Sequence, residues 1–264
     1  MKQKFLSAAA GLFVSVALLA AAPSQAAGSL DAIKAKKSIS IGIPTDFAPY
    51  GFMGTDFQPQ GVDVETAKLI AEKLGVKADL VPVSTPNRIP YLQTNKVDLV
   101  ISALGKTEER AKVLDFSIAY APFYQGIFGP KALSIKSFDD LAGKTIAVTR
   151  GTIQDDLLQQ VAPPSLKIQR FEDDASTVTA FITQQTQLIA TGGAVAAAAI
   201  DRNPQAQLEY KLLLKDSPCF VGLRKGDTDL LNAVNGILRA AKADGTLEKI
   251  SQKWLKRGTG NLPE

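Results

Sequence analysis

The amino-acid sequence predicts an α/β fold built from mostly parallel sheets that are flanked by helices. From Lys37 onward, strand-like and helix-like segments alternate, which is typical of parallel sheets covered by helices. The alternation occurs in two blocks, which meet at an extended aromatic stretch from Tyr120 to Phe128. The chain has 264 residues, 45% of them apolar, so it can bury a core as one large domain or two smaller ones.

The first residues have the pattern of a secretory signal peptide. Two lysines within the first four residues precede an uncharged run from Phe5 to Ala22, and Ser24-Gln25-Ala26 places small residues three and one before a cleavage site. The alternative is an uncleaved membrane anchor, but the run is rich in alanine and no cationic cluster follows it. We therefore expect cleavage after Ala26, which removes residues 1–26 and releases a soluble periplasmic protein.

The first block predicts strands and helices in alternation. Ile39, Ile41 and Ile43 recur at a period of two, as in a strand, and residues 64–74 follow a helical period that ends at Gly75. The remaining segments of this block are strands at 76–83 and 97–101 and helices at 86–93 and 108–113.

The second block repeats this scheme before the chain ends in two amphipathic helices. The block contains strands at 145–148, 166–171 and 188–190 and helices at 152–161 and 175–184. The first terminal helix is expected between Asp227 and Gly245, and the second carries Trp254 on its apolar face. We expect Trp254 in the core and Cys219 as a buried, unreactive thiol.

The composition excludes several classes of chemistry. The chain has no histidine, so it cannot contain a Ser-His-Asp relay, a Cys-His relay or a His-ligated zinc site, and its single cysteine cannot form an internal disulfide. The net charge of +4 falls to +2 once the two lysines of the signal peptide are removed, so we expect no nucleic-acid partner. We also expect no metal and no cofactor.

Four loops follow predicted strands at the edge where open α/β sheets bind ligands. The loop after 97–101 carries Ser102, Gly105, Thr107 and Arg110. The planar guanidinium of Arg110 suits a carboxylate ligand. The alternative is that Arg110 is a solvated helix residue paired with the neighbouring glutamates.

The other three loops give weaker signals. Thr152 begins a predicted helix whose N–H groups favour an anion, although it also fits an ordinary helix cap. Phe47, after the first strand, suits packing against an apolar part of a ligand and equally suits the core. The fourth loop, Thr191-Gly192-Gly193, is either part of the site or a bare turn.

Eight segments share their residues and their order with one protein family. They are Gly61-Val62-Asp63-Val64-Glu65, Asn87-Arg88-Ile89-Pro90, Lys96-Val97-Asp98-Leu99-Val100, Thr107-Glu108-Glu109-Arg110 with Asp115-Phe116-Ser117, Asp140-Leu141-Ala142-Gly143-Lys144, Arg150-Gly151-Thr152, Gly222-Leu223-Arg224-Lys225-Gly226-Asp227 and Ala243-Asp244-Gly245-Thr246. Together they cover nearly the whole chain after residue 26. The chain thereby resembles the polar amino-acid solute-binding proteins of bacterial ABC importers, which are type II periplasmic binding proteins of solute-binding protein family 3.

The resemblance implies two α/β lobes that are joined by two hinge strands and close on a ligand in the cleft between them. Lobe 1 would contain residues 27–124 and 219–264, and lobe 2 residues 125–218. The implied function is the capture of an amino acid, with a polar or acidic one favoured, and its delivery to an inner-membrane ABC permease. The implied protein is a monomer and not an enzyme.

The resemblance also implies roles for individual residues. In the family, the arginine placed like Arg110 binds the α-carboxylate of the ligand, and the aromatic residue placed like Phe47 packs over the ligand's side chain. Groups that assist the arginine match Ser102, Gly105, Thr107 and Thr152. Arg88 matches an arginine that binds the ligand side chain in glutamate and aspartate binders, and capping of local backbone is an equal alternative.

One position departs from the family pattern. The family has an aspartate that receives the α-ammonium of the ligand, and Gly192 stands at that position here. The substitute would be Asp46, Asp216 or backbone carbonyls around Gly192, or else the ligand is not an ordinary α-amino acid.

Two other functions fit the same scaffold less well. An exported enzyme similar to the cyclohexadienyl dehydratases needs a general acid with a tuned pKa, and nothing in the four loops marks such a residue. The sensor domain of a membrane receptor is disfavoured because the sequence ends at Glu264 without a second apolar span.

Overall fold

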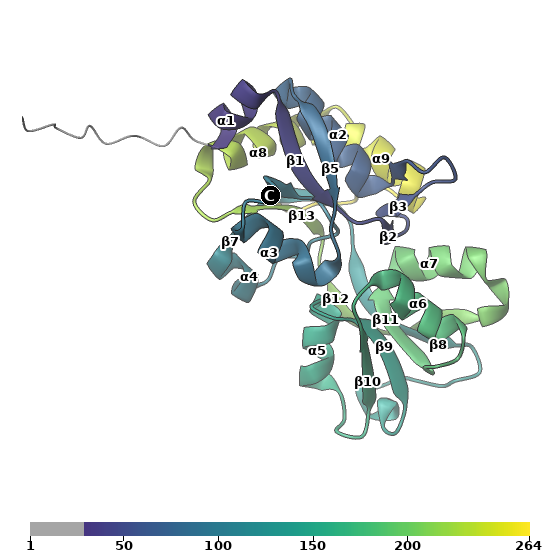
Figure 1. Ribbon diagram of the computed structural model, residues 1–264. Helices are drawn as coiled ribbons and strands as arrows, with labels where there is room; N and C mark the ends of the chain where they lie inside the picture. Colours follow the sequence, from purple (N-terminus) through teal and green to yellow (C-terminus); the bar gives the residue numbers. More distant parts are fainter. Residues whose placement is uncertain (1–28) are drawn as a thin grey trace, which may run out of the picture.

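The computed structural model describes residues 29–264 and contains two five-stranded sheets, one in each of two lobes (Figure 1). Helices flank both sheets, and the strands of each sheet are mostly parallel. The predicted two-lobe α/β fold is therefore confirmed. The predicted signal peptide, residues 1–26, lies outside the described residues.

Lobe 1 contains the sheet with the order β5-β1-β6-β13-β7. Strand β1 is parallel to β5 and β6, whereas β13 is antiparallel to β6 and β7. The strands are β1 (Ser38–Ile43), β5 (Lys77–Pro82), β6 (Leu99–Val100), β7 (Leu114–Ala121) and β13 (Cys219–Arg224). The helices are α1 (Ser29–Lys36), α2 (Val62–Leu74), α3 (Arg88–Gln93), α4 (Glu108–Val113), α8 (Thr228–Ala243) and α9 (Thr246–Leu255), and η1 (Thr85–Asn87) is a short 3₁₀ turn.

Lobe 2 contains the sheet with the order β10-β9-β11-β8-β12. The three strands β10, β9 and β11 are parallel, and β8 is antiparallel to β11 and β12. The strands are β8 (Tyr124–Pro130), β9 (Thr145–Thr149), β10 (Lys167–Phe171), β11 (Leu188–Gly192) and β12 (Leu208–Asp216). The helices are α5 (Ile153–Val161), α6 (Asp174–Ile182) and α7 (Gly193–Arg202), with 3₁₀ turns η2 (Phe138–Leu141) and η3 (Pro204–Ala206).

The chain crosses between the lobes twice, at adjacent places. It passes from β7 to β8 through Pro122-Phe123 and returns from β12 to β13 through Ser217-Pro218. The backbone N–H of Ser217 donates to the carbonyl of Phe123 at 3.0 Å, so the two crossings lie side by side. Paired crossings of this kind let two lobes rotate about one axis. The lobe limits at residues 124 and 218 stay a prediction.

Each lobe has its own core. Ile39, Ile41 and Ile43 of β1 are all buried, as their spacing predicts. Cys219 is also fully buried, and burial raises the pKa of its thiol well above the usual value, which confirms the expectation of an unreactive cysteine. Trp254 is partly buried and packs edge-on against Phe52 at the margin of the lobe 1 core.

Two features differ from the sequence prediction. A small sheet of β2 (Asp46–Phe47), β3 (Gly51–Met53) and β4 (Pro59–Gln60) follows β1 where only a loop was expected. The loop predicted at 191–193 does not exist, because β11 runs to Gly192 and α7 begins directly at Gly193. A Cβ at residue 193 would lie 1.9 Å from the ring of Tyr124, so glycine permits this tight junction.

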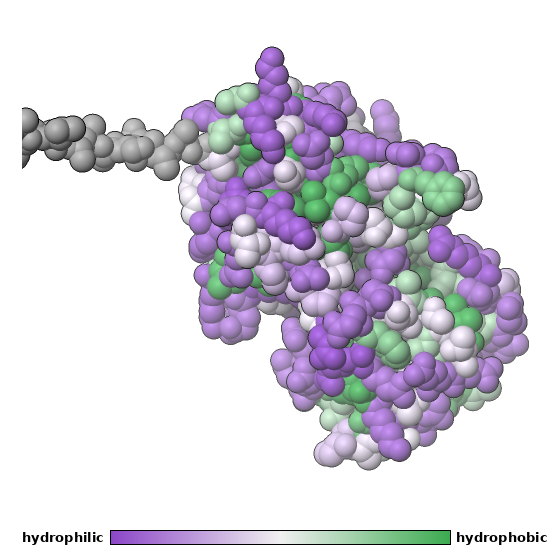
Figure 2. Space-filling view, viewed as in Figure 1, coloured by the Kyte–Doolittle hydropathy of each residue, from purple (hydrophilic) through white to green (hydrophobic). Residues whose placement is uncertain are grey.

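The outer surface is mostly polar. Figure 2 shows hydrophilic residues over much of the visible face, with an indentation between the upper lobe and the lower lobe. Within residues 29–264, none of the helices combines the length and the apolar character that a membrane crossing requires.

Candidate ligand-binding cleft

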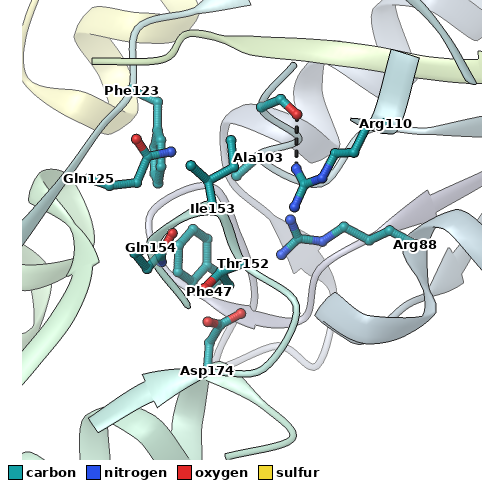
Figure 3. Close-up of a pocket in the computed structure, with 11 residues that line it drawn as sticks. Phe47, Arg88, Ala103, Arg110, Phe123, Gln125, Thr152, Ile153, Gln154 and Asp174 are labelled. Atoms are coloured by element: carbon teal, nitrogen blue, oxygen red, sulfur yellow. Dashed lines mark hydrogen bonds between the residues drawn. The ribbon is translucent and has the colours of Figure 1, made fainter. Parts of the chain in front are cut away.

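A small cavity lies between the two lobes, near the crossings (Figure 3). Its volume of about 20 Å³ is roughly enough for one water molecule, so the lobes are closed on each other. The lining residues from lobe 1 are Phe47, Arg88, Ala103, Gly105, Arg110 and Phe123, and those from lobe 2 are Gln125, Thr152, Ile153, Gln154 and Asp174. Residues from both lobes therefore face one common cavity.

Arg110 lies in the first turn of α4 and reaches across the cleft. Its guanidinium donates to the carbonyl of Gly105 in lobe 1 at 2.9 Å and to the carbonyl of Gly151 in lobe 2 at 3.0 Å. Burial, and to a smaller extent the nearby charge of Arg88, lower the pKa of Arg110 to about 10, while Asp156 acts in the opposite direction. The arginine is thus a half-buried cleft residue, whereas Glu108 and Glu109 next to it are exposed.

The loop that precedes Arg110 is held in place by a buried carboxylate. Asp63 of α2 accepts hydrogen bonds from the backbone N–H of Ala103 at 2.8 Å and from the hydroxyl of Tyr120 at 2.6 Å. Ala103 has a φ of 43°, a conformation that non-glycine residues rarely adopt, so the carboxylate fixes an unusual backbone turn. Burial raises the pKa of Asp63 to about 6.

Thr152 caps the N-terminus of α5 at the cleft wall. Its hydroxyl donates to the carbonyl of Thr149 at 2.8 Å and accepts from the N–H of Asp155 at 3.2 Å, so it has no further hydrogen to donate to a ligand. The N–H groups of the first turn of α5 are the remaining donors there. Ile153 packs directly over Gly105, where a Cβ would lie 2.4 Å from its Cδ1 atom.

Arg88 and Asp174 form a polar network across the cleft. The Arg88 guanidinium donates to the hydroxyl of Thr85, which in turn donates to the Asp174 carboxylate at 3.1 Å. The hydroxyl of Thr149 donates to the other oxygen of Asp174 at 2.6 Å. Burial lowers the pKa of Arg88, and the negative charges of Asp174 and Asp63 oppose this shift.

The carboxyl of Asp174 is buried at the N-terminus of α6. Its pKa is raised to about 6, mainly because burial disfavours the charged form, while Arg88 acts in the opposite direction. The sequence analysis did not select Asp174. Asp174 follows the predicted strand at 166–171. The carboxyl end of that strand lies at the same edge of the sheet as the other loops of the site, and this position is the signal that could have identified Asp174.

The ten residues that the sequence analysis selected fall into two groups. The residues that line the cavity are Phe47, Arg88, Gly105, Arg110 and Thr152. The residues that do not line it are Asp46, Ser102, Thr107, Gly192 and Asp216. No finding tests their roles in binding, which stay predictions.

The five residues outside the cavity have other surroundings. The Asp46 carboxylate accepts the backbone N–H groups of Asp174 and Ala175 at 2.9 and 3.2 Å, across the cleft. Thr107 caps α4 by accepting the N–H of Arg110 at 3.2 Å. Ser102 is buried beside Ala103, and Asp216 is exposed at the end of β12.

Gly192 faces an aromatic ring. A Cβ at this position would lie 2.4 Å from the ring of Phe123, which itself packs against Phe47 and Tyr50. The aromatic cluster of Phe47, Tyr50 and Phe123 thus occupies the space into which a longer side chain at residue 192 would extend.

Comparison with known proteins gives a consistent result. The sequence model of the bacterial extracellular solute-binding proteins, family 3, matches residues 39–257. The ABC transporter glutamine-binding protein GlnH of Bacillus subtilis is 30% identical over 97% of this chain and 98% of its own length. The L-cystine-binding protein TcyJ of Escherichia coli K12 is 29% identical over 86% of each chain.

Solved structures share the fold. A mutant of ArgBP from T. maritima superposes with a TM-score of 0.81 at 32% identity, over 87% of this chain and all of that one. The ancestral amino acid-binding protein AncCDT-1, a precursor of cyclohexadienyl dehydratase, superposes with a TM-score of 0.79 at 34% identity, over 86% of this chain and 99% of that one. The chain therefore belongs to family 3 of the bacterial extracellular solute-binding proteins.

Proposed function

We propose that the protein is the substrate-binding component of an ABC importer, which captures an amino acid between its lobes and delivers it to an inner-membrane permease. The observation that carries the proposal is the half-buried Arg110 guanidinium, which contacts both lobes at the cavity between them. The relatives that are named for binding glutamine and cystine support the same class of ligand.

In this function, Arg110 binds the carboxylate of the ligand through two parallel N–H···O bonds. The bonds to the carbonyls of Gly105 and Gly151 use two of the five guanidinium N–H groups, which leaves three as donors to a ligand. The N–H groups at the start of α5 add donors to the same carboxylate when the lobes close again. The rings of Phe47 and Phe123 provide apolar walls for the rest of the ligand.

The proposed place of work is the periplasm. The charged, apolar and small-residue segments at the N-terminus follow the order of a cleavable signal peptide. Removal of residues 1–26 would leave 238 of the 264 residues, which we propose act as a monomeric carrier. N-terminal sequencing of the periplasmic fraction tests this step, and an intact Met1 in the membrane fraction would contradict it.

A thermal-shift screen tests the proposed function. The mature protein is unfolded, dialysed and refolded to remove carried ligand, and is then melted with each common amino acid. A ligand at 100 times its Kd should stabilise the folded protein by about 2.7 kcal/mol. If no amino acid raises the melting temperature, the function is not amino-acid capture.

The raised pKa of Asp174 favours a second candidate, an enzyme of the cyclohexadienyl dehydratase type. A buried carboxyl with a pKa of about 6 has the property that a general acid needs at neutral pH. Conversion of prephenate by the wild-type protein, lost in Asp174→Asn, would establish the enzyme; prephenate that stays unchanged would exclude it.

A further inference from the structure

Asp174 is the one carboxylate among the described residues that line the cavity. Two guanidinium groups, those of Arg88 and Arg110, line the same cavity, and they lie close to each other in Figure 3 while Asp174 points into the space from the opposite side. The cavity therefore has two cationic groups from lobe 1 and one anionic group from lobe 2, with the Thr85 hydroxyl between Arg88 and Asp174.

The other carboxylates near the cleft are not placed to meet a ligand. The Asp46 carboxylate caps the backbone of α6, and Asp216 is exposed outside the cavity. At residue 192, the ring of Phe123 occupies the space of any side chain. An ammonium group inside this cavity consequently has one carboxylate to approach.

We propose that Asp174 accepts the α-ammonium group of the amino acid whose carboxylate binds Arg110. The inference rests on the proposed function and names the residue that completes it. Each oxygen of Asp174 accepts one hydroxyl hydrogen bond, from Thr149 and Thr85. A carboxylate has about four acceptor sites, so both oxygens keep capacity for an ammonium donor.

The network around Asp174 suits this role. Thr149 and Asp174 belong to lobe 2, whereas Thr85 belongs to lobe 1, so opening of the cleft removes the Thr85 bond and frees an acceptor site. The hydroxyl oxygens of Thr149 and Thr177 lie 2.8 Å apart and share a hydrogen bond, which holds the Thr149 hydroxyl against the Asp174 carboxylate. A bound ammonium would add an ionic contact to the two hydroxyl hydrogen bonds of this buried carboxylate.

The charges also define the class of ligand. Two guanidinium groups and one ionised carboxylate leave the lining with one net positive charge. A ligand with net charge 0 or −1 balances this lining better than a cationic one, since a basic side chain would meet a guanidinium and no second carboxylate. The favoured ligands are amino acids with amide or acidic side chains.

Titration calorimetry with matched probe pairs tests the proposal. L-glutamate is compared with glutarate, and L-glutamine with 5-amino-5-oxopentanoate, so that each pair differs only in the α-ammonium group. L-arginine serves as the cationic probe. The proteins are the wild type, Asp174→Asn and the control Asp173→Asn, which makes the same change in a neighbouring side chain that bonds to the N–H of Ser176 outside the cavity.

Asp174→Asn should weaken binding of L-glutamate or L-glutamine by at least about 30-fold, because a buried charge pair loses one partner. The Kd of the same variant for the member of each pair that lacks the ammonium group should stay within threefold of the wild-type value. Asp173→Asn should bind both members of each pair with wild-type affinity. Wild type should bind L-arginine more weakly than the tighter of the two favoured amino acids. A preference for L-arginine would overturn the charge argument.

An equal loss for both members of a pair, or no loss for either, would overturn the assignment of Asp174. Wild type that binds glutarate but neither amino acid would overturn it as well. Failure of wild type to bind any of the five probes or any other amino acid would refute the proposed function itself, and the wild-type arm alone reveals that case. If Asp174→Asn does not fold, Asp174→Glu should keep the preference for the ammonium-bearing probe and Asp174→Gln should lose it.

Discussion

At the scale of single residues, Arg110 tests whether the cleft binds a carboxylate. Arg110→Met should weaken amino-acid binding by roughly 30-fold to several thousand-fold, since the ligand's carboxylate loses its desolvated partner. The affinity of Arg110→Lys should lie between those of wild type and Arg110→Met, because lysine keeps the charge but lacks the planar guanidinium group. Titration calorimetry measures each Kd.

The control for this experiment is Arg150→Met, which removes an exposed arginine next to the same cleft that pairs with Glu172 at 2.7 Å. It should bind the amino acid as wild type does. Binding by Arg110→Met within threefold of wild type would show that Arg110 does not hold the ligand. Loss of apo stability together with binding would show that the arginine is a structural link between Gly105 and Gly151.

A second residue-scale prediction concerns Asp63 and pH. Its pKa rises from 3.8 to about 6 on folding, so the native state binds the proton more tightly than the unfolded state does. The stability contribution of this group is therefore complete below pH 4 and is lost as pH rises through 6. At 1.36 kcal/mol per pKa unit, the loss is about 3 kcal/mol.

Urea unfolding of wild type and Asp63→Asn between pH 4 and pH 7 measures this effect. Asparagine does not titrate, so the unfolding free energy of the variant should improve relative to wild type by up to about 3 kcal/mol across that range. A difference between the two proteins that is independent of pH would contradict the raised pKa of Asp63.

At the scale of elements, the contact between β2 and α6 predicts how the lobes stay closed. Asp46 accepts the first two N–H groups of α6 from the opposite lobe, as a helix-capping carboxylate does. Asp46→Ala should therefore destabilise the closed state. The affinity for every ligand should fall by about 2- to 30-fold, because loss of a cap costs about 0.5 to 2 kcal/mol. Calorimetry with L-glutamine and 5-amino-5-oxopentanoate checks this.

A cap and a ligand-binding group give different results in that experiment. If Asp46 acts only as a cap, both probes lose affinity equally, whereas a role in ammonium binding would affect L-glutamine alone. Asp56→Ala is the control, because Asp56 bonds to the backbone of Gln58 within its own exposed hairpin.

The elements that could be predicted from the sequence are those with a clear period. The alternating isoleucines of β1 and the amphipathic faces of α8 and α9 appear where expected. Helix α7 was not predicted, because Gly193 to Ala199 consists of glycine, alanine and valine and has no polar face to mark a 3.6-residue period. The strands β2, β3 and β4, of two or three residues each, are too short to show any period.

The site was predictable only where a local motif exists. Arg110 and Thr152 follow strand ends in recognisable segments, and both line the cavity. Asp174 faces that cavity because α6 meets η1 and β2 of the other lobe, a contact between segments about 90 and 128 residues apart in sequence. Pairing of groups across a cleft depends on how the lobes dock, and no local pattern encodes it.

At the scale of the whole molecule, the closed state has direct bonds between its lobes. Asp46 bonds to α6, Arg110 to Gly151, and Thr85 to Asp174. These bonds surround a cavity of about 20 Å³, far below the 300 Å³ or more of usual ligand pockets. The proposed capture of an amino acid in this cavity requires the lobes to separate, so it predicts exchange between an open and a closed state.

Electron paramagnetic resonance measures this exchange directly. Asn87→Cys and Glu172→Cys place one spin label on each rim of the cleft, since both side chains are exposed and Thr85 and Asp174 near them bond across it. The natural Cys219 is fully buried and escapes labelling in the folded protein. Without ligand, part of the population should show a long distance between labels, and a saturating amino acid should convert it to the short one. Asp46→Ala should enlarge the open fraction before ligand is added, because the closed state has lost its cap. A label distance that is the same with and without a ligand known to bind would show that the lobes are rigid and that closure has no part in capture.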